Sequence, residues 1–148
     1  MTRARILHLH SSFDLGGKEA RTVQLMNFFG DKAEHTVLVG DQNAMGAADA
    51  IDRSIKVEFP GDAAPSLLGK PSMWRYQKIA DYMKGFDLIL SYNWGSMDGV
   101  MTQALLGGLR GLPPLIHHED GFNEDEFERL NKKRNWFCLL YTSDAADE

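Results

Sequence analysis

Histidines and carboxylates gather in one short run near the end of the chain, His117-His118-Glu119-Asp120-Gly121. A histidine there can donate a hydrogen bond to a sugar hydroxyl or to a developing negative charge, and a carboxylate can accept bonds from hydroxyls. The run also suits a structural role, in which Asp120 or Asn123 caps a following helix and Glu126 completes a capping box. Both roles can hold at once. We predict catalytic roles for the two histidines and substrate-binding roles for the two carboxylates: His117, His118, Glu119 and Asp120.

A second group of residues that could bind a ligand is Gly16-Gly17-Lys18, which follows the first apolar run. Two glycines let the backbone approach a ligand closely and adopt a positive φ, and the next helix offers unpaired N–H groups to an anion. Lys18 can add a charge-assisted contact to a phosphate. A tight turn without a ligand explains the glycines equally well, and the spacing is neither the dinucleotide fingerprint nor a P-loop. We expect substrate contacts from Gly16, Gly17 and Lys18, and from Asn93 after a later strand.

His8 and His10 stand two residues apart in an apolar run, so on a strand both point to one face. One interpretation is a metal pair completed by residues of the His117–Asp120 run. The other is a pair of histidines buried under a helix and bonded to backbone, which we favour for His8. The single cysteine, Cys138, can form neither an internal disulfide nor a thiolate cage for a metal.

Composition sets the class of protein. With 43% hydrophobic and 25% charged residues among 148, the chain suits one globular domain. Its net charge of −5 argues against a nucleic-acid partner, because backbone affinity needs clustered cations. No apolar run reaches the ~20 residues that span a bilayer, and no secretory signal is evident, so we expect a cytoplasmic protein. Segment 65–76 mixes apolar residues with Lys70 and Arg75, which suits either peripheral membrane contact or a satellite of the core.

Short apolar runs alternate with helical stripes along the chain. We predict strands at 5–10, 36–39, 57–59, 87–91 and 115–118, and helices around 22–29, 76–83, 97–108 and, on the surface, 123–135. Such alternation predicts right-handed βαβ crossovers and an α/β, Rossmann-like parallel sheet with helices on both faces. Ligands of these sheets bind at the carboxyl ends of the strands, where the polar groups above fall.

Three segments resemble the N-terminal domain of GT-B-fold glycosyltransferases of family four, the "group 1" transferases. These are ILHLHSSFDLGGKEARTVQLMN at 6–27, with its Gly-Gly-x-Glu element, DLILSYNWGSMDG at 87–99 and PLIHHEDGF at 114–122. The resemblance implies an acceptor-side domain, with a nucleotide-sugar as donor, a carbohydrate or lipid-linked acceptor, no cofactor and no metal. It further implies that Gly16 and Gly17 face the donor diphosphate, that His117 or His118 approaches the transferred sugar, and that the anomeric configuration is retained.

The last eleven residues, CLLYTSDAADE at 138–148, match the in-frame translation of a transposon-end adaptor used in sequencing libraries. We therefore expect residues 1–137 to be an incomplete glycosyltransferase domain and 138–148 to be a non-native tail. The resemblance places donor binding in a second domain, so we expect this chain alone to transfer no sugar.

Other classes of function stay open on the sequence alone. A nucleotide-cofactor oxidoreductase would use Asp41 after the second strand to hold a ribose, although the glycine fingerprint is missing. A metal-dependent hydrolase would use His8 and His10. A noncatalytic interaction domain of the same fold is the third alternative.

Overall fold

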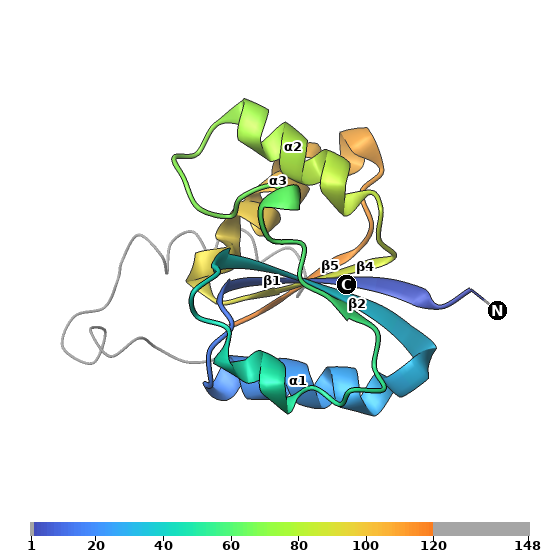
Figure 1. Ribbon diagram of the computed structural model, residues 1–148. Helices are drawn as coiled ribbons and strands as arrows, with labels where there is room; N and C mark the ends of the chain where they lie inside the picture. The colour runs from blue at the N-terminus through green and yellow to red at the C-terminus, as the bar shows by residue number, and fades with distance from the viewer. Residues whose placement is uncertain (1, 120–148) are drawn as a thin grey trace.

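The computed structural model describes residues 2–119, which form a five-stranded parallel sheet between two layers of helices (Figure 1). The strands are β1 (Ala4–Ser12), β2 (Ala33–Asp41), β3 (Val57–Glu58), β4 (Leu88–Tyr92) and β5 (Leu115–His118). The helices are α1 (Gly17–Phe29), α2 (Met73–Met83) and α3 (Met97–Arg110), with 3-10 turns η1 (Gly30–Lys32), η2 (Gly46–Ala50), η3 (Gly61–Ala63) and η4 (Trp94–Ser96). The predicted Rossmann-like α/β architecture is confirmed.

The strand order is β3-β2-β1-β4-β5, and every neighbouring pair is parallel. The chain therefore leaves β1 outward in one direction to β2 and β3, then returns and continues outward from β1 to β4 and β5. This reversal places a topological switch point between β1 and β4. Helix α1 covers one face of the sheet, while α2 and α3 cover the other (Figure 1).

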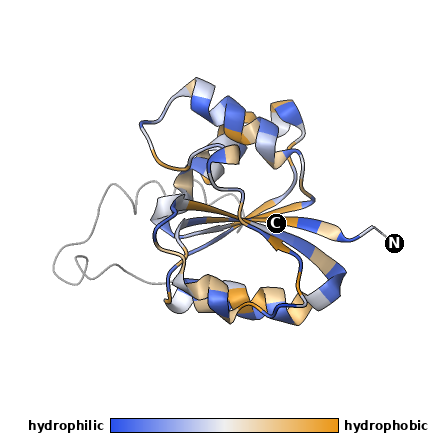
Figure 2. Cartoon of the chain, in the orientation of Figure 1, coloured by the Kyte–Doolittle hydropathy of each residue, from blue (hydrophilic) through white to orange (hydrophobic). Residues whose placement is uncertain are grey.

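The alternation of side chains along β1 divides the core into two layers. Leu7 and Leu9 point toward α2 and pack with Ile79 and Met83. The intervening residues of β1 point toward α1 instead, because successive side chains of a strand alternate between faces. Hydrophobic residues are correspondingly concentrated along the strands, between the two helical layers (Figure 2). The predicted apolar stripe of α2 is buried throughout: Tyr76, Ile79, Ala80 and Met83.

Helix ends follow their local chemistry. The side chain of Ser72 accepts the N–H of Arg75 at 3.3 Å and caps α2. Helix α3 ends at Gly111, whose left-handed backbone (φ 60°) lets the chain turn into Leu112-Pro-Pro and then β5. Strand β2 is longer than predicted at both ends because it pairs with β1 along nearly its whole length.

The segment at 65–76 packs on the core through some of its apolar residues and leaves others exposed. Leu67 and Tyr76 are buried, whereas Leu68, Met73 and Trp74 are exposed. Within residues 2–119, no helix is long and apolar enough to cross a membrane. The predicted helix at 123–135, Asp120 and the predicted tail at 138–148 lie outside the described residues.

Candidate functional site

Lys18 lies in the first turn of α1, directly after the turn from β1. Its Nζ donates to the Ser11 hydroxyl at 3.0 Å and forms an ion pair with the Glu19 carboxylate at 3.2 Å. The side chains of Lys18 and Glu19 are only 15% and 4% exposed. Glu19 belongs to the first turn of α1, where a negative charge is favoured by the helix dipole. The lysine predicted to meet a phosphate is thus already paired with an internal carboxylate.

Of the two glycines before Lys18, only Gly16 is needed for space, and neither is needed for left-handed backbone. A Cβ on Gly16 would lie 2.7 Å from Oε2 of Glu19, whereas a Cβ on Gly17 would meet nothing within 4 Å. Neither glycine has a positive φ, so that part of the prediction is wrong. Gly16 is extended (φ −152°), because it is the residue that precedes the first turn of α1. The absent side chain leaves room for the Glu19 carboxylate to fold back over the helix start.

His117 forms a second polar cluster at the ends of β4 and β5. Its Nδ1 lies 2.8 Å from the Ser91 hydroxyl, and its Nε2 lies 3.1 Å from Oε2 of Glu119. A carboxylate only accepts, so Nε2–H donates to Glu119, and a neutral His117 then accepts the Ser91 proton at Nδ1. Leu9, Ser91 and His117 are register partners across the sheet, which places His117 on the face covered by α2 and α3.

His118 lies on the opposite face of the sheet from His117. Its ring stacks on Tyr92 at a centroid distance of 5.0 Å, and its carbonyl accepts the N–H of Asn93 at 2.8 Å. The pair of histidines predicted as catalytic is therefore divided between the two faces, because adjacent strand residues point in opposite directions.

Asn93 occupies a rare backbone conformation at the carboxyl end of β4. With φ 55° and ψ −177°, it is the one non-glycine residue of positive φ within residues 2–119. Ser96 holds the turn in place, because its hydroxyl accepts the N–H of Tyr92 at 2.8 Å and donates to carbonyls of the same turn. Such conformations cost about 1–3 kcal/mol and concentrate at functional sites.

The turn after β4 also approaches the end of β1 closely. A Cβ on Gly95 would overlap Cβ of Ser11, the residue that binds Lys18. Contact between these two chain segments therefore requires glycine at 95. This contact joins the carboxyl ends of β1 and β4 at the switch point where ligands of this fold class bind.

His8 and His10 share one face of the sheet, as predicted; α1 covers that face, and both side chains are buried, with exposures of 1% and 0%. The partners of His8 are side chains rather than the expected backbone: the Tyr92 hydroxyl at 3.3 Å and His35 Nδ1 at 3.0 Å. His10 Nε2 lies 3.1 Å from the Thr22 hydroxyl. Since Thr22 donates to the Lys18 carbonyl, His10 must donate to Thr22, and this chain of bonds ties β1 to the start of α1.

Burial keeps these histidines neutral. Desolvation, followed by the charges of His35 and His118, lowers the pKa of His8 to about 3. Desolvation, followed by the charges of His8 and Lys18, lowers the pKa of His10 to about 2. Burial also lowers the pKa of His35. The three rings are therefore uncharged structural groups at neutral pH.

Within residues 2–119, the metal site weighed for His8 and His10 is not completed by further ligands. His117 lies on the other face of the sheet from His8 and His10, and no group of three or more His, Cys, Asp or Glu within residues 2–119 is placed to bind a metal ion. The Asp41 carboxylate accepts the backbone N–H of Asn43 at 3.0 Å and so organises the turn after β2.

The residues that sequence reasoning missed are the hydrogen-bond and ion-pair partners of the predicted site residues. Ser11 and Glu19 position Lys18, Ser91 bonds His117, and Ser96 supports the turn at Asn93. Glu19 carried a signal, because the Gly-Gly-x-Glu spacing sets a carboxylate in the first helical turn. The serines carried no signal of their partners, because those partners are defined only once the sheet has assembled.

No protein-family model matches the chain, and no curated protein is similar to it in sequence. Among solved structures, a similar one is UGT2 of Phytolacca americana in complex with UDP-2-fluoro-glucose and pterostilbene. The identity is 10% and the TM-score 0.39, with 79% of this chain covered. The match spans 31% of the length of that chain. At this level the likeness concerns the course of the backbone alone.

Proposed function

We propose that the chain forms the acceptor-side half of a glycosyltransferase that moves a sugar from a nucleotide-sugar to a polysaccharide or glycolipid acceptor. The observation that carries the proposal is the placement of two polar clusters at the carboxyl ends of the strands flanking the switch point. Lys18 with Ser11 and Glu19 forms one, and His117 with Ser91 forms the other. The Gly-Gly-x-Glu resemblance is the reason for proposing sugar transfer, rather than another reaction, at these clusters.

In this proposal Lys18 and the start of α1 face the donor diphosphate. Glu19 competes with that anion for Lys18 and for the helix N-terminus, so the ion pair between the two side chains must loosen as phosphate binds. His117 presents a hydrogen-bonded imidazole and the Glu119 carboxylate to sugar hydroxyls. Retention of configuration without a metal follows from the resemblance. Cytoplasmic location and peripheral membrane contact belong to the same proposal.

Anion binding tests the proposed role of the α1 start. Inorganic pyrophosphate and UDP, titrated calorimetrically, are expected to bind with half-saturation in about the millimolar range. Lys18→Gln should weaken binding about tenfold, and Glu19→Gln should strengthen it by a similar factor, because it removes a nearby like charge. Lys70→Gln, on an exposed lysine of another segment, is the matched control and should change nothing.

Two outcomes contradict the proposal. The first is pyrophosphate binding that is equal in the wild type, Lys18→Gln and Glu19→Gln. The second is NAD binding that is tighter than UDP binding and insensitive to both substitutions, which would favour a nucleotide-cofactor oxidoreductase. Sugar transfer from a nucleotide-sugar by the purified chain alone would contradict the expectation that a second domain binds the donor.

A further inference from the structure

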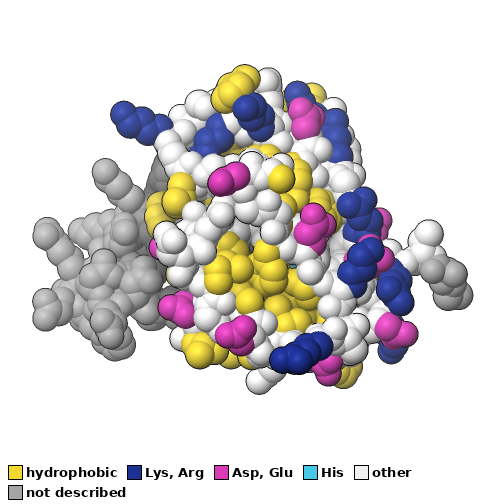
Figure 3. All heavy atoms as spheres, viewed as in Figure 1, with side chains coloured by type: hydrophobic (Ala, Val, Ile, Leu, Met, Phe, Trp, Pro, Cys, Tyr) yellow, Lys and Arg dark blue, Asp and Glu magenta, His cyan; other side chains and the backbone are white. Residues whose placement is uncertain are grey.

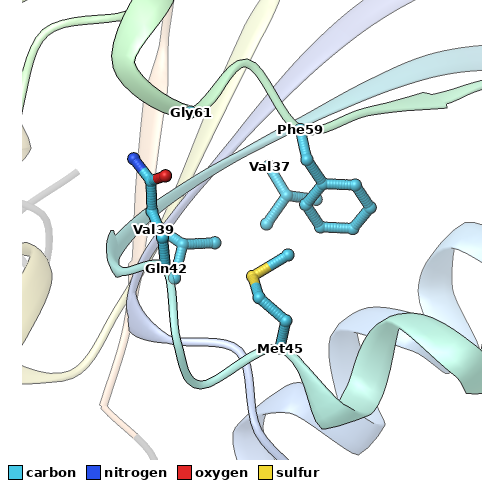
Figure 4. A pocket seen from close by; sticks show the side chains of 6 residues that line it. All are labelled: Val37, Val39, Gln42, Met45, Phe59 and Gly61. Atoms are coloured by element: carbon cyan, nitrogen blue, oxygen red, sulfur yellow. The ribbon is translucent and has the colours of Figure 1, made fainter.

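A pocket outside the proposed site lies at the β3 edge of the sheet, on the side of α1. Its lining comes from β2, from the turn after β2 and from the segment that follows β3 (Figure 4). The cavity measures about 120 Å³, and the residues around it are Val37, Val39, Gln42, Met45, Phe59 and Gly61. The face of the molecule that carries this edge shows a patch of hydrophobic side chains (Figure 3).

The walls of the pocket are suited to a ring. Val37 and Val39 form an aliphatic side, while the Phe59 ring and the Met45 side chain point toward the same space (Figure 4). A phenyl ring favours offset or edge-to-face contact with another aromatic ring, and a methionine sulfur favours contact with a ring edge. An enclosed apolar cavity of about 150 Å³ accommodates benzene, so this somewhat smaller and partly open pocket has room for one six-membered ring at most.

One hydrogen-bonding group stands at the rim. Nε2 of Gln42 donates to Oδ1 of Asp62 at 3.2 Å, and this bond fixes the orientation of the amide because a carboxylate only accepts. Oε1 of Gln42 is then left as an acceptor. It lies 3.3 Å from where a Cβ on Gly61 would stand. Gly61 has a φ of 55°, so glycine both suits this backbone and keeps the rim open beside the acceptor.

We propose that this pocket binds a single aromatic ring carrying a hydrogen-bond donor, the chemistry of a phenol. The ring contacts Phe59, Met45 and the valines, and its hydroxyl donates to Oε1 of Gln42. The pocket adjoins the turn into α1, because Phe59 packs on Phe13 at a centroid distance of 5.7 Å. The inference is independent of the proposed sugar transfer, since none of the lining residues belongs to the Lys18 or His117 clusters.

Methyl NMR of the full chain with 13C-labelled methionine methyl groups tests this site, with phenol and toluene as probes. The Met45 signal, assigned with Met45→Leu, should shift saturably with phenol in about the millimolar range. Toluene should bind about three- to tenfold more weakly, because it lacks the donor. Met83, buried on the opposite face, and Met73, exposed on α2, are internal controls whose signals should stay in place.

Two variants separate the parts of the proposal. Gln42→Ala, at an exposed position, should remove the preference for phenol while toluene binds as before. Val39→Phe should fill the cavity and abolish the shift with both probes. The proposal is overturned if Met45 shows no saturable shift, if Met73 shifts equally, or if Gln42→Ala retains the preference for phenol.

Discussion

Acidification from pH 7.5 to 5.0 should destabilise this fold through its buried histidines. His8 and His10 are buried and neutral in the native state, with pKa values lowered to about 3 and about 2. In the unfolded chain each imidazole accepts a proton near pH 6.5. Below that pH the unfolded state therefore binds more protons than the native state, and the free energy of unfolding falls as pH falls.

The size of the effect follows from these pKa values. Between pH 7.5 and 5.0 the native rings stay neutral while the unfolded ones become protonated. This difference removes about 2 kcal/mol per histidine, or about 4 kcal/mol for His8 and His10 together. The lowered pKa of His35 acts in the same direction. The loss continues until the pH passes the native pKa values, and it is large for a domain whose whole stability is about 5–15 kcal/mol.

Urea unfolding followed by circular dichroism at several pH values between 7.5 and 5.0 measures this slope. The midpoint should fall by about 2 M over the range, for an m-value of about 2 kcal/mol/M. His10→Gln is the informative variant, because its amide can still donate to Thr22 but does not titrate. It should reduce the pH dependence by about 2 kcal/mol, whatever its stability at pH 7.5.

A wild-type stability that stays constant from pH 7.5 to 5.0 would refute the reasoning, as would a slope that His10→Gln leaves unchanged. The pKa of Glu34 is lowered chiefly by its hydrogen bond to Lys56, and that of Asp52 by its bonds to Ser54, so both stay charged in the native state across this window. The comparison with His10→Gln isolates the histidine contribution, because that variant removes one imidazole and no carboxylate.

Three further predictions concern the turns around the candidate site. Asn93→Gly should raise the free energy of unfolding by about 1 kcal/mol, because glycine accepts a φ of 55° without strain, whereas Asn93→Ala should lower it. Thermal unfolding of the two variants and the wild type measures this order of stability, and an Asn93→Gly variant less stable than the wild type would contradict the prediction. Gly95→Ala should lower the free energy of unfolding by about 1–3 kcal/mol, because its Cβ would overlap Ser11. Gly17→Ala, whose Cβ would meet nothing within 4 Å, is the matched control and should be neutral or slightly stabilising. Equal denaturation midpoints for the two variants would contradict this prediction. Ser96→Ala should lower the free energy of unfolding by about 1–3 kcal/mol, because it deprives the buried N–H of Tyr92 of its acceptor. Hydrogen exchange at the Tyr92 amide should accelerate, and unchanged protection would refute the role of Ser96.

The sequence by itself determined the architecture of this protein. Apolar periodicity is a local property, so the stripe at Tyr76–Met83 and the continuous run at 87–91 specified a helix and a strand without knowledge of their partners. Their alternation required parallel strands, and parallel strands bring their carboxyl ends together. The neighbourhood of Lys18, Asn93 and His117 was predictable for that reason.

Only the tertiary structure decided what those side chains contact. Ser91 and His117 are 26 residues apart in the chain, and Ser11 meets the turn at Gly95 only because β1 and β4 are adjacent in the sheet. The bond from Lys18 to Ser11 and the side-chain partners of His8 arise in the same way. Each depends on how closely separate segments pack, a distance that residue type and spacing along one segment do not encode.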